Sequence, residues 1–113
     1  MTILVHAEIH GLVGRDAELR ALLASHAAAT ARAPGSEGCA AYAPLDAEPG
    51  EYVLDAWWRD EAAMRAHYGS EEYGLYASSV GELLARPSDV RIHYVERSVR
   101  PQGDASLDPS RLG

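Results

Sequence analysis

Two adjacent tryptophans and a histidine in the stretch DAWWRDEAAMRAH, residues 55–67, have types and a spacing that point to chemistry. An indole ring can form the wall of a flat pocket and stack on an aromatic ligand. An imidazole with an unperturbed pKa of roughly 6.5 can take a phenolic proton near neutral pH. Trp58 and His67 are therefore the candidate catalytic pair. The alternatives are core packing for Trp58 and a hydrogen bond at a helix end for His67.

Tyr73 and Tyr76 fall on the inward stripe of a later helical segment. Their hydroxyls could donate to a substrate oxygen, or they could be core tyrosines with a local hydrogen-bond partner. Cys39 is interpreted as a small buried hydrophobe, because no cationic neighbour that would activate its thiol is evident. The chain has no P-loop, no glycine fingerprint for dinucleotides and no nucleophile elbow.

A second pattern, His6-x-Glu8-x-His10, places three potential metal ligands on one face of a strand, and His93 could join them. Alternate residues on a strand lie roughly 7 Å apart, however, which is long for two ligands of one ion. The pattern therefore favours a polar stripe within or at the mouth of a dimer barrel, and no metal is expected.

Length and composition limit the classes of protein that this chain can be. Its 113 residues predict one domain, and 47% hydrophobic with 24% charged residues indicate a globular protein. A net charge of −7 argues against nucleic-acid and anionic-membrane partners. No apolar run approaches the roughly 20 residues that span a membrane. The single cysteine fits a reducing cytoplasm.

Periodicity predicts the elements that position these residues. Four segments are predicted strands, of which the first alternates most clearly: 3–10, 39–45, 52–59 and 89–97. Three helices are each predicted to begin at a capping residue and to end at a glycine or proline signal: Asp16 to the PGSEG break at 34–38, Asp60 to Gly69, and Ser70 to Pro87.

The order β-α-β-β-α-β, with the second helix broken in two, predicts an α+β ferredoxin-like fold: a four-stranded antiparallel sheet with helices on one face. Strand alternation then turns Leu54 and Trp58 toward the helices, and Asp55 and Trp57 toward the open face. An open sheet face that carries a tryptophan predicts a homodimer packed sheet to sheet. The expected domain spans residues 2–95, followed by a polar C-terminal tail over 96–113.

The segments HAEIHGLVG, SEGCAAYAPLD and YVLDAWWRDEAAMRAHYGSEEY together resemble the antibiotic biosynthesis monooxygenase domain family, and most of all its small bacterial quinol monooxygenases. The resemblance covers about residues 2–95. It implies a dimeric α+β barrel. It also implies oxidation of a quinol or polyhydroxylated aromatic compound by molecular oxygen, with no metal or flavin. Other members of the family cleave haem.

Residue by residue, the resemblance carries over to Trp58, at the strand end that borders the family's pocket, and to His67 on the following helix. Other positions depart from the family's patterns, and most of them carry apolar residues. They are Ala56 for an acid, Leu54 for an asparagine, Met64 for a tyrosine, and about Ala7 and Ala77 for the asparagine and histidine of the haem-cleaving branch.

Two functions remain open from the sequence. The first is a cofactor-independent monooxygenase with His67 as the base and Trp58 as the pocket wall. In that case Tyr73, Tyr76, Leu54 and Met64 would line the substrate site. The second is a non-catalytic dimeric barrel that binds a small aromatic ligand or a protein partner, which the apolar departures favour.

Overall fold

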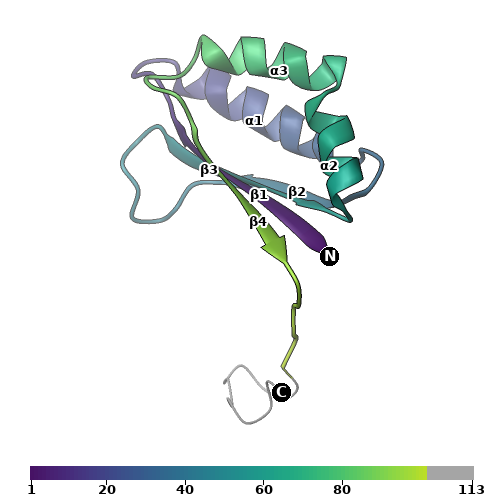
Figure 1. Cartoon of the computed structure of the whole chain (residues 1–113). Helices are drawn as coiled ribbons and strands as arrows, with labels where there is room; N and C mark the ends of the chain where they lie inside the picture. The colour runs from purple at the N-terminus through teal and green to yellow at the C-terminus, as the bar shows by residue number, and fades with distance from the viewer. Residues whose placement is uncertain (102–113) are drawn as a thin grey trace.

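The computed structural model of this chain describes residues 1–101. Strands and helices follow one another in the predicted order along the chain (Figure 1). Their bounds are β1 Thr2–His10, α1 Asp16–Ala31, β2 Ser36–Tyr42, β3 Glu51–Trp58, α2 Glu61–Tyr68, α3 Glu71–Gly81 and β4 Asp89–Val95.

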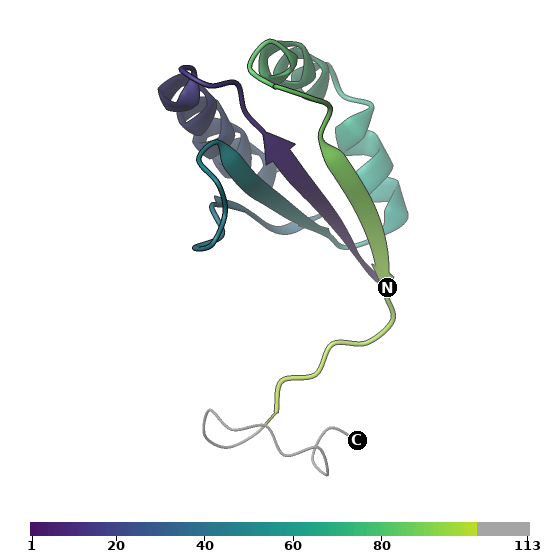
Figure 2. The same ribbon diagram turned by 90° about the vertical axis from the view of Figure 1, so that its left-hand side faces the viewer.

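The four strands form one antiparallel sheet in the order β2-β3-β1-β4, and the helices lie together on one of its faces (Figures 1 and 2). Helix α1 packs on β2 and β3, and α3 lies beside it over the β1 and β4 side of the sheet (Figure 2). The predicted α+β ferredoxin-like fold with helices on one sheet face is therefore confirmed. No helix formed by residues 1–101 lies on the opposite sheet face.

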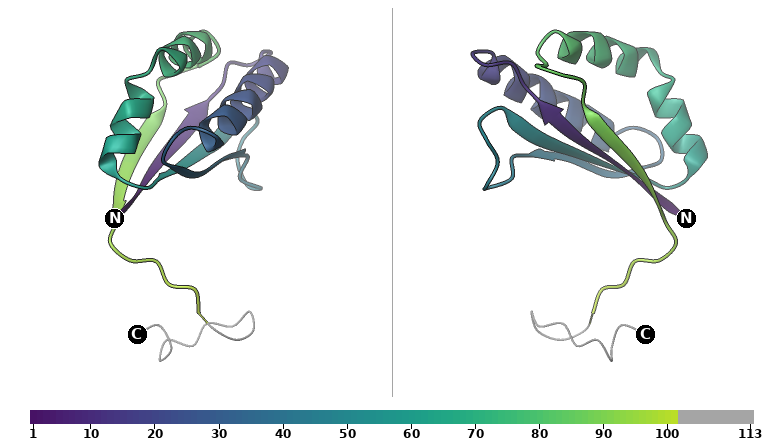
Figure 3. Two further views of the ribbon diagram at one scale, coloured as in Figure 1. Left: turned by 90° about the vertical axis from the view of Figure 1, so that its right-hand side faces the viewer. Right: turned by 60° about the vertical axis from the view of Figure 1, so that its left-hand side comes forward.

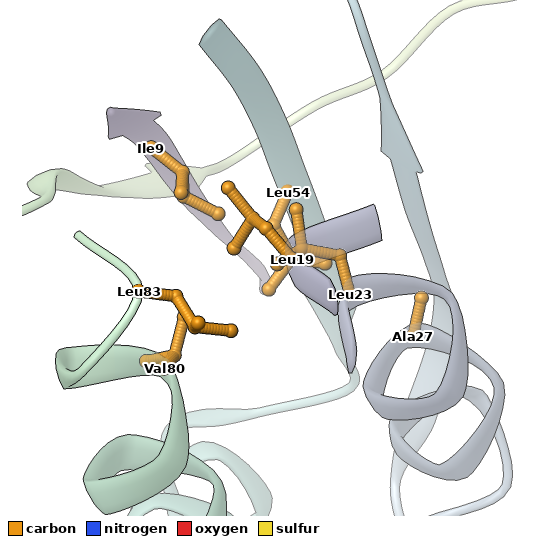
Figure 4. Close-up of a cluster of buried hydrophobic side chains, with 7 residues drawn as sticks. All are labelled: Ile9, Leu19, Leu23, Ala27, Leu54, Val80 and Leu83. Atoms are coloured by element: carbon orange, nitrogen blue, oxygen red, sulfur yellow. The ribbon is translucent and has the colours of Figure 1, made fainter. Parts of the chain in front are cut away.

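The register of β1 and β3 determines which side chains face the helices. Ile3 pairs with Trp58, and every second pair along the two strands, from Val5–Ala56 to Ile9–Tyr52, also points its side chains toward the helices. These positions and the inward stripe of α1 form the hydrophobic core, part of which is drawn in Figure 4. The members of that cluster are Ile9, Leu19, Leu23, Ala27, Leu54, Val80 and Leu83. The core thus joins the sheet to both long helices.

Asp16 was expected to cap the first helix, and this prediction is wrong. Arg15 is the N-cap and makes no side-chain cap bond, whereas Asp16 is the first helical residue. Its carboxylate instead accepts a hydrogen bond from the Tyr52 hydroxyl at 2.5 Å. Asp60 and Ser70 do cap α2 and α3, accepting from the backbone N–H of Ala63 and Tyr73 respectively.

The second strand and the third helix have other limits than predicted. Strand β2 begins at Ser36, because Gly35 turns the chain with a φ of +79° and a register shift follows between Ser36 and Gly38. It ends at Tyr42, two residues before Pro44, which cannot donate to a ladder. Helix α3 ends at Gly81, so the last part of the expected stripe belongs to a turn in which Leu83 is still buried.

Strand β4 ends at Val95, two residues before the predicted limit, and residues 96–101 continue away from the sheet without regular structure (Figure 3). Most of the predicted polar tail, residues 102–113, lies outside the described residues. Within the described part of the chain, no helix has the length and apolar character needed to cross a membrane.

Candidate functional site

Trp58 lies at the end of β3, on the face of the sheet that the helices cover. Its side chain is fully buried, at 0% exposure, in a second cluster that includes Ile3, Ala63 and Met64. The neighbouring Trp57 points to the open face and is 36% exposed. Strand alternation therefore separates the two tryptophans as the sequence predicts, and only Trp58 lies near His67.

His67 lies in the last turn of α2, which Asp60 caps at one end and Gly69 at the other. Its ring centroid is 4.7 Å from that of Trp58, with the two planes tilted by 35°. The Nε2 atom is buried and has no hydrogen-bond partner among the described residues. Burial lowers the pKa of His67, while the charge of Glu72 opposes this shift. The imidazole is thus neutral at neutral pH and has a nitrogen free to accept a proton.

Three tyrosines continue the aromatic cluster from His67. Tyr68 and Tyr73 both meet His67 edge-on, at centroid distances of 4.8 and 5.6 Å, and lie 4.7 Å from each other. Tyr76 follows one helical turn later, 5.9 Å from Tyr73. Burial raises the pKa of all three phenols, that of Tyr68 to about 12. They are therefore protonated at neutral pH and can act as hydrogen-bond donors.

His26 on α1 completes the cluster, and the sequence analysis did not select it as a site residue. Its ring stacks on Tyr76, with centroids 3.5 Å apart and planes 7° apart, and lies 6.0 Å from His67. Burial, followed by the charge of His67, lowers the pKa of His26 to about 4. The available signal was a histidine within the apolar stripe of α1, between Leu22 and Thr30.

Two hollows adjoin this cluster. An apolar cleft of about 230 Å³ lies between the sheet and α3, toward the edge strand β4. Its lining includes Val5, Ala7, Leu54, Tyr68, Tyr73, Tyr76, Ala77, Val80, Leu84, Val90 and Ile92. A more polar groove of about 490 Å³ lies between α1 and α3. Its lining includes Leu22, Ser25, His26, Thr30, Arg32, His67, Glu72, Tyr73, Leu75, Tyr76 and Ser79.

The predicted site residues divide between these hollows. Leu54 borders the cleft, His67 borders the groove, and Tyr73 and Tyr76 border both. Trp58 and Met64 border neither, because both are buried in the cluster between α2 and the sheet, Met64 on α2 and Trp58 on β3. The structure thus brings Trp58, His67 and the tyrosines into one aromatic cluster, while Met64 belongs to the packing around it.

Two further positions of the cleft bear on the haem-cleaving branch of the resembled family. Ala7 on β1 and Ala77 on α3, which stand in place of that branch's asparagine and histidine, both line the cleft. Neither methyl group can ligate iron or donate a hydrogen bond. These two positions therefore do not supply the asparagine and histidine side chains of that branch.

The polar stripe on the open sheet face forms separate hydrogen-bonded pairs. His6 Nδ1 lies 2.6 Å from Asp55 Oδ1, and the Tyr42 hydroxyl donates to the other oxygen of Asp55 at 2.5 Å. His10 pairs instead with Glu51. Over residues 1–101, no group of three or more histidine, cysteine or acidic side chains is arranged to hold a metal ion. The alternating histidines therefore have acidic side chains as partners.

Cys39 faces the helix layer and packs against both hydrophobic clusters. Burial, with a smaller contribution from Asp55, raises the pKa of its thiol to about 11. The thiol is therefore protonated at neutral pH, in line with the sequence-based interpretation of a small hydrophobic residue.

Comparison with known proteins identifies relatives of this chain. A family model described as antibiotic biosynthesis monooxygenase matches residues 2–78. The protein Rv0793 of Mycobacterium tuberculosis is 40% identical over 57 residues, which are 50% of this chain and 56% of that protein. Superposed on the structure of Rv0793, the chain reaches a TM-score of 0.74 at 31% identity, with 94% of this chain and 100% of the other covered.

Two more distant solved structures share the fold. SnoaB of Streptomyces nogalater, a cofactor-independent oxygenase, superposes with a TM-score of 0.75 at 21% identity, covering 87% of this chain and 96% of that one. A conserved protein of Methanosarcina mazei gives a TM-score of 0.76 at 20% identity, with coverages of 82% and 91%. At these identities the similarity concerns the fold alone.

Proposed function

This chain belongs to the antibiotic biosynthesis monooxygenase family, and we propose that it oxidises a quinol or polyhydroxylated aromatic compound with molecular oxygen, without a cofactor. The observation that carries the proposal is the apolar cleft near the half-buried, neutral imidazole of His67, whose Nε2 atom is buried without a hydrogen-bond partner among the described residues. A flat aromatic ring fits the chemistry of the cleft lining, and His67 lies immediately behind the Tyr68–Tyr73 pair that borders it.

The proposed first step is removal of a phenolic proton by His67 Nε2. Since His67 borders the groove and not the cleft, we propose that the phenolic hydroxyl reaches between Tyr68 and Tyr73 to the Nε2 atom, which has no hydrogen-bond partner among the described residues. The resulting anion is a stronger reductant than the neutral quinol and gives one electron to oxygen, which yields superoxide and a semiquinone radical. Tyr73 and Tyr76 are the proposed donors to the anionic oxygen, since preorganised donors stabilise developing charge in a dry site.

The radical pair has two balanced outcomes. If superoxide takes a second electron and two protons, the products are the quinone and hydrogen peroxide. If oxygen adds to the ring, one oxygen atom remains in a hydroxyquinone and the other leaves as water. We propose the second, monooxygenase outcome as the main reaction, which the name of the family supports.

Oxygen uptake with a panel of one-ring and two-ring quinols tests this function. We expect oxygen uptake above the uncatalysed rate and loss of turnover under argon. With ¹⁸O₂ as the oxygen source, the product should carry one atom of ¹⁸O. Saturable binding of the quinols with no added uptake would instead indicate the non-catalytic aromatic-binding barrel. The alkyl side chains at Ala7, Leu54 and Ala77 are the observation that favours this second candidate.

We further propose that two copies pack through their open sheet faces. Trp57 projects from that face among the polar pairs of His6 and Asp55, and tryptophan is enriched at the centre of protein interfaces. The resulting homodimer would close the dimeric α+β barrel. A reducing compartment, the cytoplasm, fits the lone, half-buried Cys39 and is the proposed location.

A further inference from the structure

The two hollows are separated by side chains that belong to both of them. Tyr73 and Tyr76 line the apolar cleft on the sheet side of α3 and also the groove between α1 and α3. Both are half-buried. Their rings therefore form a partition between a small apolar space and a larger, more polar one.

One half of this partition is held from the opposite helix. The His26 ring lies parallel to the Tyr76 ring at a centroid distance of 3.5 Å. The imidazole is itself fixed, because its Nε2 atom lies 3.4 Å from the hydroxyl oxygen of Thr30, a residue with 2% exposure. Tyr76 thus has a stacked partner on the groove side, and moving its ring toward the groove would break that stack.

The cleft is small for a ligand site. Its volume of about 230 Å³ is below the roughly 300–1,000 Å³ of most small-molecule pockets. The cleft therefore suits a ligand of one or two aromatic rings, and a system of four fused rings would need the space of the groove as well.

We propose that the His26–Tyr76 stack sets the size of the aromatic ligand that this protein accepts. With the stack in place, the cleft takes one-ring and two-ring hydroxylated aromatics. With the stack removed, the cleft and the groove join into one larger site that admits fused systems of four rings. The inference rests on the cleft being the ligand site of the proposed function, but it does not require turnover.

Equilibrium binding of two fluorescent phenols under argon tests the inference without any reaction. The probes are 2-naphthol, with two rings, and 1-hydroxypyrene, with four. The wild-type chain is expected to bind 2-naphthol at least tenfold more tightly than 1-hydroxypyrene. Tyr76→Ala should bring the two dissociation constants to within about threefold of each other. Leu75→Ala is the matched control, since Leu75 borders the groove alone and should keep the wild-type ratio.

A second variant covers the case in which Tyr76→Ala does not fold. His26→Ala removes the stacked partner and leaves Tyr76 in place, so the affinity ratio should fall by at least threefold. Wild-type protein that binds both probes equally, or a folded Tyr76 or His26 variant with an unchanged ratio, would overturn the inference while leaving the ligand site intact. Wild-type protein that binds neither probe would overturn the ligand site of the proposed function and the inference with it.

Discussion

The imidazole of His67 lies against the indole of Trp58, with ring centroids 4.7 Å apart and planes 35° apart. Trp58 is inaccessible to solvent, so it acts on a ligand only through the position that it gives to His67. The short helix α2 carries His67 in its last turn, and its caps at Asp60 and Gly69 fix where His67 sits. In the proposed mechanism, Trp58 therefore supports the ring of His67, which is the proposed base.

Replacing His67 by alanine should slow oxygen consumption at least tenfold, because the phenolic proton then lacks its acceptor. Steady-state oxygen uptake at a saturating quinol concentration measures the effect. Arg65→Ala is the matched control on the same helix, since that exposed side chain bonds only Glu61 on the surface. Equal rates in the His67 and Arg65 variants would remove His67 from the mechanism.

Replacing Trp58 by alanine should lower the free energy of unfolding by about 3–5 kcal/mol, because a fully buried aromatic ring leaves a cavity that the core cannot refill. Urea unfolding followed by circular dichroism measures the loss. Trp57→Ala, at the neighbouring position on the open face, should cost less than half as much. Losses of equal size would show that the two tryptophans are not distinguished by burial as described.

Strand alternation and helix capping, both read from short stretches of sequence, predict much of how the site residues are positioned. Alternation along residues 52–59 predicts that Trp58 points toward the helices and Trp57 away from them, because successive strand residues point to opposite faces. The capping side chains of Asp60 and Ser70 predict where α2 and α3 begin, since each bonds a backbone N–H three residues later. These relationships need no knowledge of the rest of the chain.

What the sequence did not predict depends on contacts between distant segments. The Asp16 carboxylate has a partner 36 residues away, the Tyr52 hydroxyl, and this outcome is invisible to a local capping rule. The His26–Tyr76 stack depends on the spacing between α1 and α3, which helical periodicity leaves open. The distance between α1 and α3 also determines that Tyr73 and Tyr76 border both the cleft and the groove. Residue types alone therefore could not predict which side chains line the site.

The open sheet face should make the protein a dimer of about twice its 12.2 kDa chain mass. Trp57→Glu should convert it to a folded monomer, because dimerisation would bury an unpaired charge. Light scattering after size-exclusion chromatography at about 100 µM protein measures the mass, with circular dichroism as the folding check. Val13→Glu, at a fully exposed loop position, is the control and should stay dimeric. A monomeric wild-type protein, or a dimeric Trp57→Glu variant, would contradict the proposed interface.

The neutral state of His26 should make stability depend on pH. Its pKa of about 4 in the folded protein is below the unfolded value, so the folded state binds fewer protons between about pH 6.5 and 4. Stability is then fully present above pH 6.5 and is lost as the pH falls toward 4. After allowing for solvent screening of a partly exposed ring, the loss from His26 should be about 1–2 kcal/mol.

Urea unfolding at pH 7 and pH 4.5 isolates this contribution when the wild type is compared with His26→Gln. The variant should lose less stability on acidification than the wild type, because glutamine does not titrate. Ser25→Ala, one residue earlier on α1, removes no titrating group and keeps His26, so its stability should depend on pH as that of the wild type does. Identical pH dependence in the His26 variant and the wild type would show that this imidazole does not titrate as described.

Gly35 should be intolerant of any side chain, because it brings α2 onto the sheet. A Cβ atom there would lie 2.3 Å from the Cβ of Ala63, and its φ of +79° is a further strain for a non-glycine residue. Gly35→Ala should cost about 1–2 kcal/mol for the backbone and about 1–3 kcal/mol more for the clash, measured by urea unfolding. Gly14→Ala, with a φ of +86° and nothing within 4 Å, should show the backbone cost alone.

The Gly35 substitution should also affect the site. The carbonyl oxygen of Gly35 accepts a hydrogen bond from the backbone N–H of Arg59 at 2.8 Å, so the clash would shift α2 and move His67 away from Trp58. Quinol turnover should therefore fall in the Gly35 variant but not in the Gly14 variant, and equal stability and turnover in both would contradict this role of the close approach.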